Sequence, residues 1–218
     1  MTVTGIIFDC DGTLLDSMEA WLSTEAQLAA QAGIKIGDEE STYIGTLRIS
    51  EVGTYFHEKF GLGTSAEDVV SMIYEIMRIN YRTCVKPRLG ALEFVRQASS
   101  QGIVCSVASA TPLSLLTEAL ELTGFAPYLK AIVSVEEVGV SKGNPAVYDY
   151  ALSKMGTDKE STWVFEDAAY ALKTVKDAGY PAIGIYDCDI AGTHEQLSIA
   201  DLVIDNFNEL DIAGFIGN

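Results

Sequence analysis

The chain has 218 residues, enough for one large domain or for a core with a small second domain, and 48% of them are hydrophobic. Its 14 basic and 31 acidic residues give a formal net charge of −17, which argues against a nucleic acid or an anionic membrane surface as partner. No apolar run approaches the roughly 18 residues of a membrane span, and no basic region precedes the short first run. We therefore expect a cytoplasmic protein without a signal peptide. The four cysteines (Cys10, Cys84, Cys105 and Cys188) form no Cys-x-x-Cys pair, so we expect buried free thiols.

The first predicted element is a short apolar strand, residues 4–8, which ends on two acids, Asp9 and Asp11, and a Gly-Thr turn. A strand that delivers acids onto a glycine turn is typical of the carboxyl edge of an open α/β sheet. Two carboxylates about 4 Å apart repel by about 4 kcal/mol at an effective dielectric constant near 20. A fold keeps such a pair where a cation lies between the acids, or where one acid is a nucleophile and the other an acid/base. Alone, Asp-x-Asp is more often a solvated turn.

Helices without a strand are predicted for residues 17 to about 86. Ser17 is a candidate N-cap for a helix that ends near Gly33. Residues 50–60 and 66–83 also have helical patterns, and in the second of these the apolar side chains recur at helical spacing. This segment is therefore predicted to be an all-helical insertion between the first strand and the rest of a sheet.

Helices and strands alternate from residue 89 onward. The expected helices are 89–100, 112–123, 145–155 and 168–178, and the expected strands are 103–108, 131–134, 163–165 and 182–185. Strands separated by helices indicate a doubly wound parallel sheet, and the nearly continuous apolar run at 103–108 is typical of a strand buried on both faces. The predicted fold class is α/β, with residues 1–16 and 87–218 forming the core and residues 17–86 the helical insertion.

Four motifs, in order along the chain, resemble those of the haloacid dehalogenase-like (HAD) hydrolases, a superfamily made up mostly of phosphatases. They are Asp9-Cys10-Asp11-Gly12-Thr13, Val107-Ala108-Ser109-Ala110-Thr111, Lys142 within residues 139–145, and Val164-Phe165-Glu166-Asp167. The resemblance covers nearly the whole chain. It implies a Rossmann-like core, and the insertion after the first motif resembles the helical cap of subfamily I.

The resemblance also implies a role for each motif. Asp9 is expected to attack phosphorus and form an aspartyl-phosphate. Asp11 is expected to protonate the leaving oxygen and then to deprotonate the water that hydrolyses the intermediate. Ser109 and the main-chain N–H of Ala110 are expected to bind the phosphoryl group, which Lys142 would bridge to the nucleophile.

A Mg²⁺ site is implied as well. Its expected oxygen ligands come from Asp9, the main-chain carbonyl of Asp11, and Asp167, with Glu166 either a ligand or a supporting neighbour. Taken singly, these acids have a simpler explanation, because Glu166 and Asp167 could cap the helix that follows them. Likewise, Ser109 could be an ordinary N-cap and Lys142 a solvated loop residue. The functional interpretation depends on all of the motifs occurring together.

Three residues of the cap, Arg48, Trp21 and Arg78, are tentative substrate contacts. Arg48 matches an arginine that β-phosphoglucomutase-like enzymes use on a distal phosphate. Trp21 and Met77 stand roughly where those enzymes place a histidine and a lysine, and Arg78 adjoins the second position. A solvated surface explains both arginines equally well, and core packing is the simpler explanation for Trp21. Tyr81, with other cap tyrosines, either lines a substrate pocket or packs the cap.

The predicted function is a Mg²⁺-dependent phosphatase that acts on a small phosphorylated metabolite, such as a sugar phosphate. Asp11 argues against a dehalogenase, because dehalogenases of this superfamily lack the second acid. The alternatives are a hexose-phosphate mutase, and a catalytically silent homologue that binds a phosphometabolite or a protein through its cap. The negative net charge repels an anionic substrate, so a metal ion and a few placed cations must attract it. No sequence motif indicates an oligomer interface, and a monomer is compatible with the sequence.

Overall fold

The structure is a computed structural model that describes residues 2–186 and 194–217. A six-stranded sheet has the order β5-β4-β1-β6-β7-β8, and every neighbouring pair of strands is parallel. The strands are β1 (Gly5–Phe8), β4 (Val104–Ser109), β5 (Leu129–Ser134), β6 (Thr162–Glu166), β7 (Ala182–Ile185) and β8 (Leu202–Ile204). The strand that carries the first pair of acids, β1, therefore lies in the middle of the sheet, between β4 and β6.

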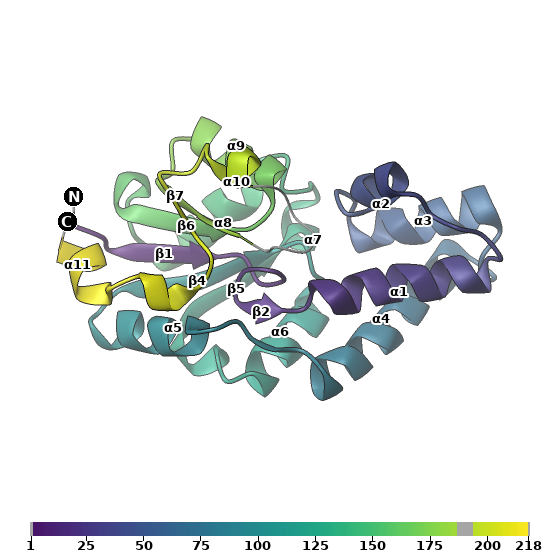
Figure 1. The fold of residues 1–218 in the computed structure, drawn as a ribbon, viewed down its shortest axis with the longest axis horizontal. Coiled ribbons are helices and arrows are strands. Elements are labelled where there is room, and N and C mark those ends of the chain that lie inside the picture. The colour runs from purple at the N-terminus through teal and green to yellow at the C-terminus, as the bar shows by residue number, and fades with distance from the viewer. Residues whose placement is uncertain (1, 187–193, 218) are drawn as a thin grey trace.

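Helices cover both faces of this sheet, as Figure 1 shows. Phe8 and Phe165 point to the face covered by α5 and α6, whereas their neighbours Ile7 and Val164 point to the face covered by α8 and α9. Both kinds of side chain are fully buried, which explains the nearly continuous apolar strands. The helices of this part are α5 (Ala91–Ser100), α6 (Leu113–Leu122), α7 (Val135–Val138), α8 (Ala146–Met155), α9 (Ala169–Asp177), α10 (His194–Leu197) and α11 (Ile212–Gly217). The predicted doubly wound α/β fold is confirmed.

Four helices extend from one end of the sheet (Figure 1). They are α1 (Met18–Gln31), α2 (Asp38–Ile44), α3 (Ile49–Phe60) and α4 (Ala66–Thr83). Two short strands, β2 (Leu15–Asp16) and β3 (Lys86–Pro87), pair antiparallel where the chain enters the four helices and where it leaves them. These strands lie at the expected ends of the insertion, and the division into two domains stays a prediction.

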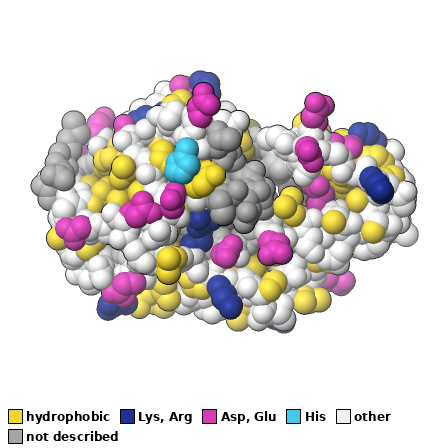
Figure 2. All heavy atoms as spheres, viewed as in Figure 1, with side chains coloured by type: hydrophobic (Ala, Val, Ile, Leu, Met, Phe, Trp, Pro, Cys, Tyr) yellow, Lys and Arg dark blue, Asp and Glu magenta, His cyan; other side chains and the backbone are white. Residues whose placement is uncertain are grey.

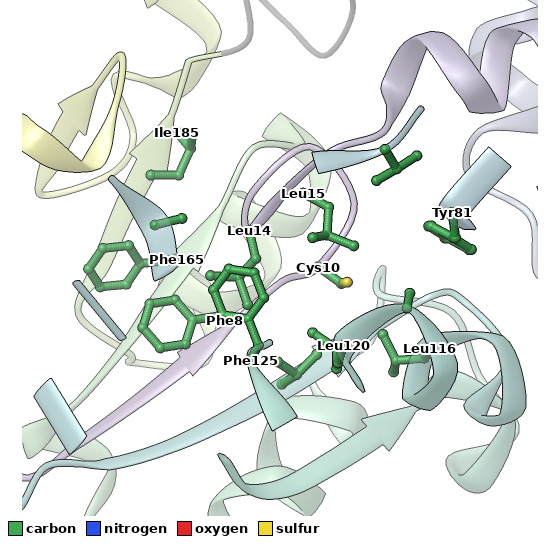
Figure 3. Close-up of a cluster of buried hydrophobic side chains, with 14 of the residues drawn as sticks. Phe8, Cys10, Leu14, Leu15, Tyr81, Leu116, Leu120, Phe125, Phe165 and Ile185 are labelled. Atoms are coloured by element: carbon green, nitrogen blue, oxygen red, sulfur yellow. The ribbon is translucent and has the colours of Figure 1, made fainter. Parts of the chain in front are cut away.

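A continuous hydrophobic cluster connects these helices with the sheet (Figure 3). It runs from Phe8 and Phe165, on the face of the sheet that α5 and α6 cover, past Leu116 of α6 and Cys10, to Tyr81 of α4. Helix α4 also packs directly on α6. The helical segment therefore packs on the core through its last helix, α4, next to the first motif.

The structure differs from the sequence expectations mainly in its short elements. Helices α2, α7, α10 and α11 and strands β2, β3 and β8 were not expected, because segments of two to seven residues are too short to show a period. The thiols of Cys10 and Cys105 are free and buried as expected, but Cys84, just past α4, is exposed. Cys188 lies outside the described residues. Among the described helices, none combines the length and apolar character needed to cross a membrane.

Candidate active site

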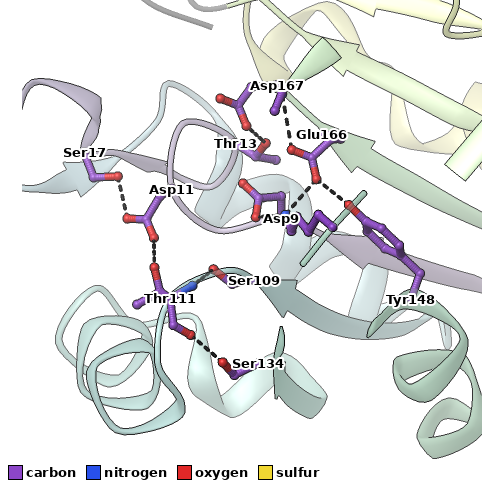
Figure 4. Close-up of polar contacts among 12 residues, drawn as sticks. Asp9, Asp11, Thr13, Ser17, Ser109, Thr111, Ser134, Tyr148, Glu166 and Asp167 are labelled. Carbon is purple, nitrogen blue, oxygen red and sulfur yellow. Dashed lines mark hydrogen bonds and ion pairs between the residues drawn. The ribbon is translucent and has the colours of Figure 1, made fainter. Parts of the chain in front are cut away.

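The predicted site residues converge at the carboxyl ends of the three central strands (Figure 4). Asp9 follows β1 directly, Ser109 is the last residue of β4, and Glu166 is the last residue of β6. Because β1 pairs with both β4 and β6 in parallel register, these strand ends lie side by side at one edge of the sheet. The topology thus gathers three motifs that lie far apart in the sequence.

Lys142 lies between two acids of this edge. Its Nζ donates to Asp9 Oδ1 in a short contact and to Glu166 Oε2 at 2.7 Å. All three side chains are buried. Burial lowers the pKa of Lys142, but the charges of Asp9 and Glu166 outweigh burial and hold this pKa well above its ordinary value. Lys142 is therefore a permanent cation beside Asp9.

A third buried acid, Asp167, makes the site strongly negative. Asp9, Glu166 and Asp167 each offer a carboxylate oxygen, and these oxygens lie within 4.8 Å of one another. Burial, followed by the charge of Glu166, raises the pKa of Asp9 from 3.8 to about 7. Burial and the charge of Asp9 raise the pKa of Asp167 well above 3.8. One ammonium does not balance these carboxylates, and an all-oxygen donor set of this kind fits a hard divalent cation.

The turn after Asp11 shapes the same cluster. Gly12 has a φ of 87°, and a Cβ at this position would overlap the Asp167 carboxylate. The next residue, Thr13, donates from its hydroxyl to Asp167 Oδ1 at 3.1 Å. Sequence reasoning gave no role to Thr13, since its partner lies 154 residues away.

Asp11 has a different environment from Asp9, because its carboxylate accepts only from hydroxyl groups in the contacts seen. Oδ1 accepts from Ser17 Oγ at 2.7 Å and from Tyr81 OH at 2.8 Å, and Oδ2 accepts from Thr111 Oγ1 at 2.6 Å. Ser17 precedes α1 as expected, but its side chain makes no capping hydrogen bond and turns to Asp11 instead. The Asp11 carboxylate is not in the acidic cluster, so the expected metal contact through its main-chain carbonyl stays a prediction.

The second motif contacts the first one through Thr111 and Asp11. Ser109 Oγ accepts from the main-chain N–H of Thr111 at 3.0 Å, which fixes the turn that contains Ala110. The carbonyl of Thr111 in turn accepts from Ser134 Oγ at 2.8 Å. A hydroxyl that accepts in this way still has its hydrogen to donate, so Ser109 keeps the capacity to bind an anionic oxygen.

The three tentative cap contacts lie in different surroundings. Arg48 Nη1 donates to the carbonyl of Gly139 at 2.9 Å, on the loop that leads to Lys142, and its other amino group pairs with Glu51. Arg78 pairs with Glu118 of α6 at 3.0 Å. Trp21 is partly buried and packs against the hydrophobic cluster that links cap and core.

Comparison with known proteins identifies the family. A model of the family described as "Haloacid dehalogenase-like hydrolase" matches residues 6–185. Hexitol phosphatase B of Escherichia coli (strain K12) is 26% identical over 218 residues, which cover 99% of this chain and 97% of that protein. N-acetylmuramic acid 6-phosphate phosphatase of Pseudomonas aeruginosa is 22% identical over 182 residues, covering 82% of this chain and 80% of that protein. The chain belongs to the haloacid dehalogenase-like hydrolases.

The fold agrees with this membership. The crystal structure of CbbY from Rhodobacter sphaeroides in complex with phosphate superposes with a TM-score of 0.82 at 22% identity, covering 95% of this chain and 96% of that one. The predictions of the superfamily, and of a phosphoric monoester hydrolase within its phosphatase branch, are confirmed by the family match and the relatives. Phosphatases of this family generally use a divalent metal, and the buried acidic cluster is compatible with one.

Proposed function

We propose that this protein is a Mg²⁺-dependent phosphatase that hydrolyses a small phosphorylated metabolite through an aspartyl-phosphate on Asp9. The observation that carries the proposal is the buried group of three carboxylates around one ammonium. An isolated cluster of this kind is costly to bury, and it is useful where a cation and a phosphoryl group complete its charge balance.

The chemistry follows from the surroundings of each side chain. Asp9 attacks phosphorus, and Lys142 stays beside it to offset the negative charge of the transferred group. Ser109 and the main-chain N–H of Ala110 bind the phosphoryl oxygens. Asp11, held by hydroxyl groups away from the acidic cluster, delivers a proton to the leaving oxygen and later takes one from the attacking water.

The metal site would be formed by Asp9 and Asp167, with the main-chain carbonyl of Asp11 as the resemblance to the family implies. When bound there, Mg²⁺ supplies positive charge that draws the phosphoryl group in and neutralises it. This local charge matters because the protein carries a net charge of −17, and Figure 2 shows acidic side chains on the surface of both the core and the cap. Glu166 belongs to the same cluster, although both of its oxygens already accept from groups of the chain.

A sugar phosphate or a related monoester is the proposed substrate class. This choice is supported by the relatives, which include a hexitol phosphatase and an N-acetylmuramic acid 6-phosphate phosphatase. Arg48, Trp21 and Arg78 remain the proposed cap contacts. The guanidinium groups of Arg48 and Arg78 have partners on the core, so a substrate would have to compete with the carbonyl of Gly139 or with Glu118 for them.

The packing of the cap favours a phosphatase over the mutase alternative. Met77, at the place where mutase-like relatives are expected to carry a lysine, is fully buried, and its sulfur accepts from Thr24 Oγ1 at 3.2 Å. Met77 therefore packs in the interior of the cap, where a substrate does not reach it. A silent, purely binding homologue is disfavoured by Lys142 and Asp9, since a binding site gains nothing from a nucleophile paired with a buried cation.

Phosphate release tests the proposal directly. The panel contains hexitol phosphates, hexose phosphates and N-acetylmuramic acid 6-phosphate, each with and without Mg²⁺, and Asp9→Asn is the control. We expect turnover that requires the metal and is lost in the variant. Conversion of β-glucose 1-phosphate to glucose 6-phosphate without phosphate release would establish the mutase instead. Wild-type protein that behaves like Asp9→Asn on every compound would leave only a binding role.

A further inference from the structure

A buried tyrosine shares a hydrogen-bond acceptor with the proposed catalytic lysine, Lys142. Tyr148 of α8 is fully buried, and its hydroxyl donates to Glu166 Oε2 at 2.9 Å. The same oxygen accepts from Lys142 Nζ at 2.7 Å, and this Nζ lies 5.7 Å from the centre of the Tyr148 ring. Figure 4 shows the ring directed from its helix toward Glu166. The phenol and the ammonium thus meet on one carboxylate oxygen.

The second oxygen of Glu166 is engaged as well. Oε1 accepts from the main-chain N–H of Ala168 at 3.2 Å, at the start of α9. Glu166 is therefore held from three sides: by a phenol on α8, by a main-chain amide before α9 and by Lys142. A buried carboxylate with several donors has its orientation fixed by them, because turning it would leave buried polar groups without partners.

Packing alone does not explain a tyrosine at this position. A phenylalanine would fill nearly the same volume in the apolar cluster on this face of the sheet, without a hydroxyl to desolvate. The hydroxyl contacts Glu166, which in turn contacts the cation beside the nucleophile.

We propose that Tyr148 is a positioning residue that holds Glu166 against Lys142, so that Glu166 orients the lysine and is not a ligand of the metal. This proposal adds detail to the proposed function. Only its kinetic test depends on that function, because the metal-binding and NMR tests need no turnover. Lys142 would then be aligned with Asp9 through a chain of contacts that begins on α8. Without the phenol, Glu166 loses one donor, and the ammonium loses its fixed direction toward Asp9.

The test compares Tyr148→Phe with a matched control, Tyr180→Phe. Tyr180 is also buried, its hydroxyl donates to Asp149 Oδ1 at 2.7 Å, and its ring centre lies 6.5 Å from that of Tyr148. Each change removes one phenol-to-carboxylate hydrogen bond from the same region. For Tyr148→Phe we expect kcat to fall about tenfold or more with KM unchanged, as for a lost hydrogen bond to a charged group. Tyr180→Phe should keep the wild-type kcat.

Metal binding separates the two possible roles of Glu166. Binding of Mn²⁺ alone, followed by electron paramagnetic resonance, should be unchanged in Tyr148→Phe. If Glu166 were a ligand whose support had been removed, binding would weaken about 10- to 100-fold, which would overturn the proposal. A wild-type kcat in Tyr148→Phe would also overturn it, as would an equal loss in Tyr180→Phe.

NMR spectroscopy tests the positioning role even if no substrate is turned over. Buried, hydrogen-bonded ammonium groups exchange slowly enough for ¹H–¹⁵N NMR, and the signal of Lys142 is assigned by its loss in Lys142→Met. We expect this signal to shift or broaden in Tyr148→Phe and to stay in place in Tyr180→Phe. An unmoved Lys142 signal in Tyr148→Phe would refute the positioning role, whereas absent turnover in the wild type would refute the proposed function alone.

Discussion

Replacing Asp167 by asparagine tests the charge balance of the buried cluster. Asp9, Glu166 and Asp167 each place one carboxylate oxygen within 4.8 Å of the other two. At this largest separation and an effective dielectric constant near 20, two charges repel by about 3.5 kcal/mol, and a closer pair repels more strongly. Asparagine has nearly the same shape, and its carbonyl oxygen can still accept from the hydroxyl of Thr13. The change therefore removes a charge with little loss of packing.

We expect Asp167→Asn to be more stable than the wild type in EDTA, by up to about 3 kcal/mol near pH 8. The raised pKa values of Asp9 and Asp167 determine the direction in which the free energy of unfolding changes with pH. Because the pKa of Asp9 is raised from 3.8 to about 7, the folded protein binds more protons than the unfolded chain between these values. The contribution of Asp9 to stability without metal is therefore greatest at low pH, and it is lost as the pH rises through about 7, by on the order of 4 kcal/mol. The free energy of unfolding of Asp167→Asn should decrease less with rising pH than that of the wild type.

Urea denaturation followed by tryptophan fluorescence measures these free energies of unfolding, in EDTA and in millimolar Mg²⁺. The wild type should gain stability from Mg²⁺, most strongly at high pH, and Asp167→Asn should gain little. Asp177→Asn is the control, since Asp177 is exposed and its loss should change stability by less than about 1 kcal/mol. A variant less stable than the wild type in EDTA near pH 8, or one that Mg²⁺ stabilises equally, would refute this account of the cluster.

Three other changes have defined outcomes. Lys142→Met leaves Asp9 without its buried partner, and in EDTA it should lower the free energy of unfolding by about 3–5 kcal/mol in urea denaturation; an unchanged midpoint would contradict the ion pair. Tyr81→Phe removes one donor from Asp11, and steady-state kinetics should show kcat reduced about tenfold, whereas an unchanged kcat would mean that this phenol only packs. Gly12→Ala combines a positive φ with a clash against the acidic cluster, so thermal denaturation should show a stability loss of at least about 1 kcal/mol and no stabilisation by Mg²⁺; an Mg²⁺ response equal to that of the wild type would argue against the clash.

The sequence could predict the acids of the site because each follows a recognisable strand. Asp9 and Asp167 come directly after the apolar strands β1 and β6, and the parallel topology brings those strand ends together. The spacing of strands and helices likewise indicated the doubly wound sheet. What local patterns could not show is the pairing of β2 with β3, which joins segments about seventy residues apart through two residues on each side.

The hydroxyl groups of the site were beyond the reach of pattern reasoning. Tyr81 and Thr111 donate to Asp11 across 70 and 100 residues of sequence, and neither has a local signature that points to a carboxylate. Tyr81 also occupies an apolar position of α4, where its ring packs in the shared hydrophobic cluster. Its spacing on the helix therefore indicates packing, and only the three-dimensional arrangement shows that its hydroxyl has a polar partner.

Two acids that stand two residues apart thus receive opposite surroundings, and this difference supports their different proposed roles. Asp9 faces an ammonium and two carboxylates, which suits a nucleophile that must stay fixed beside a cation. Asp11 faces neutral hydroxyl donors from the start of α1, from α4 and from the loop after β4. These neutral donors fix the direction of the Asp11 carboxylate without placing another charge beside it. Asp11 is therefore held in a fixed position outside the charged cluster, and a fixed position is what its proposed role in proton transfer requires.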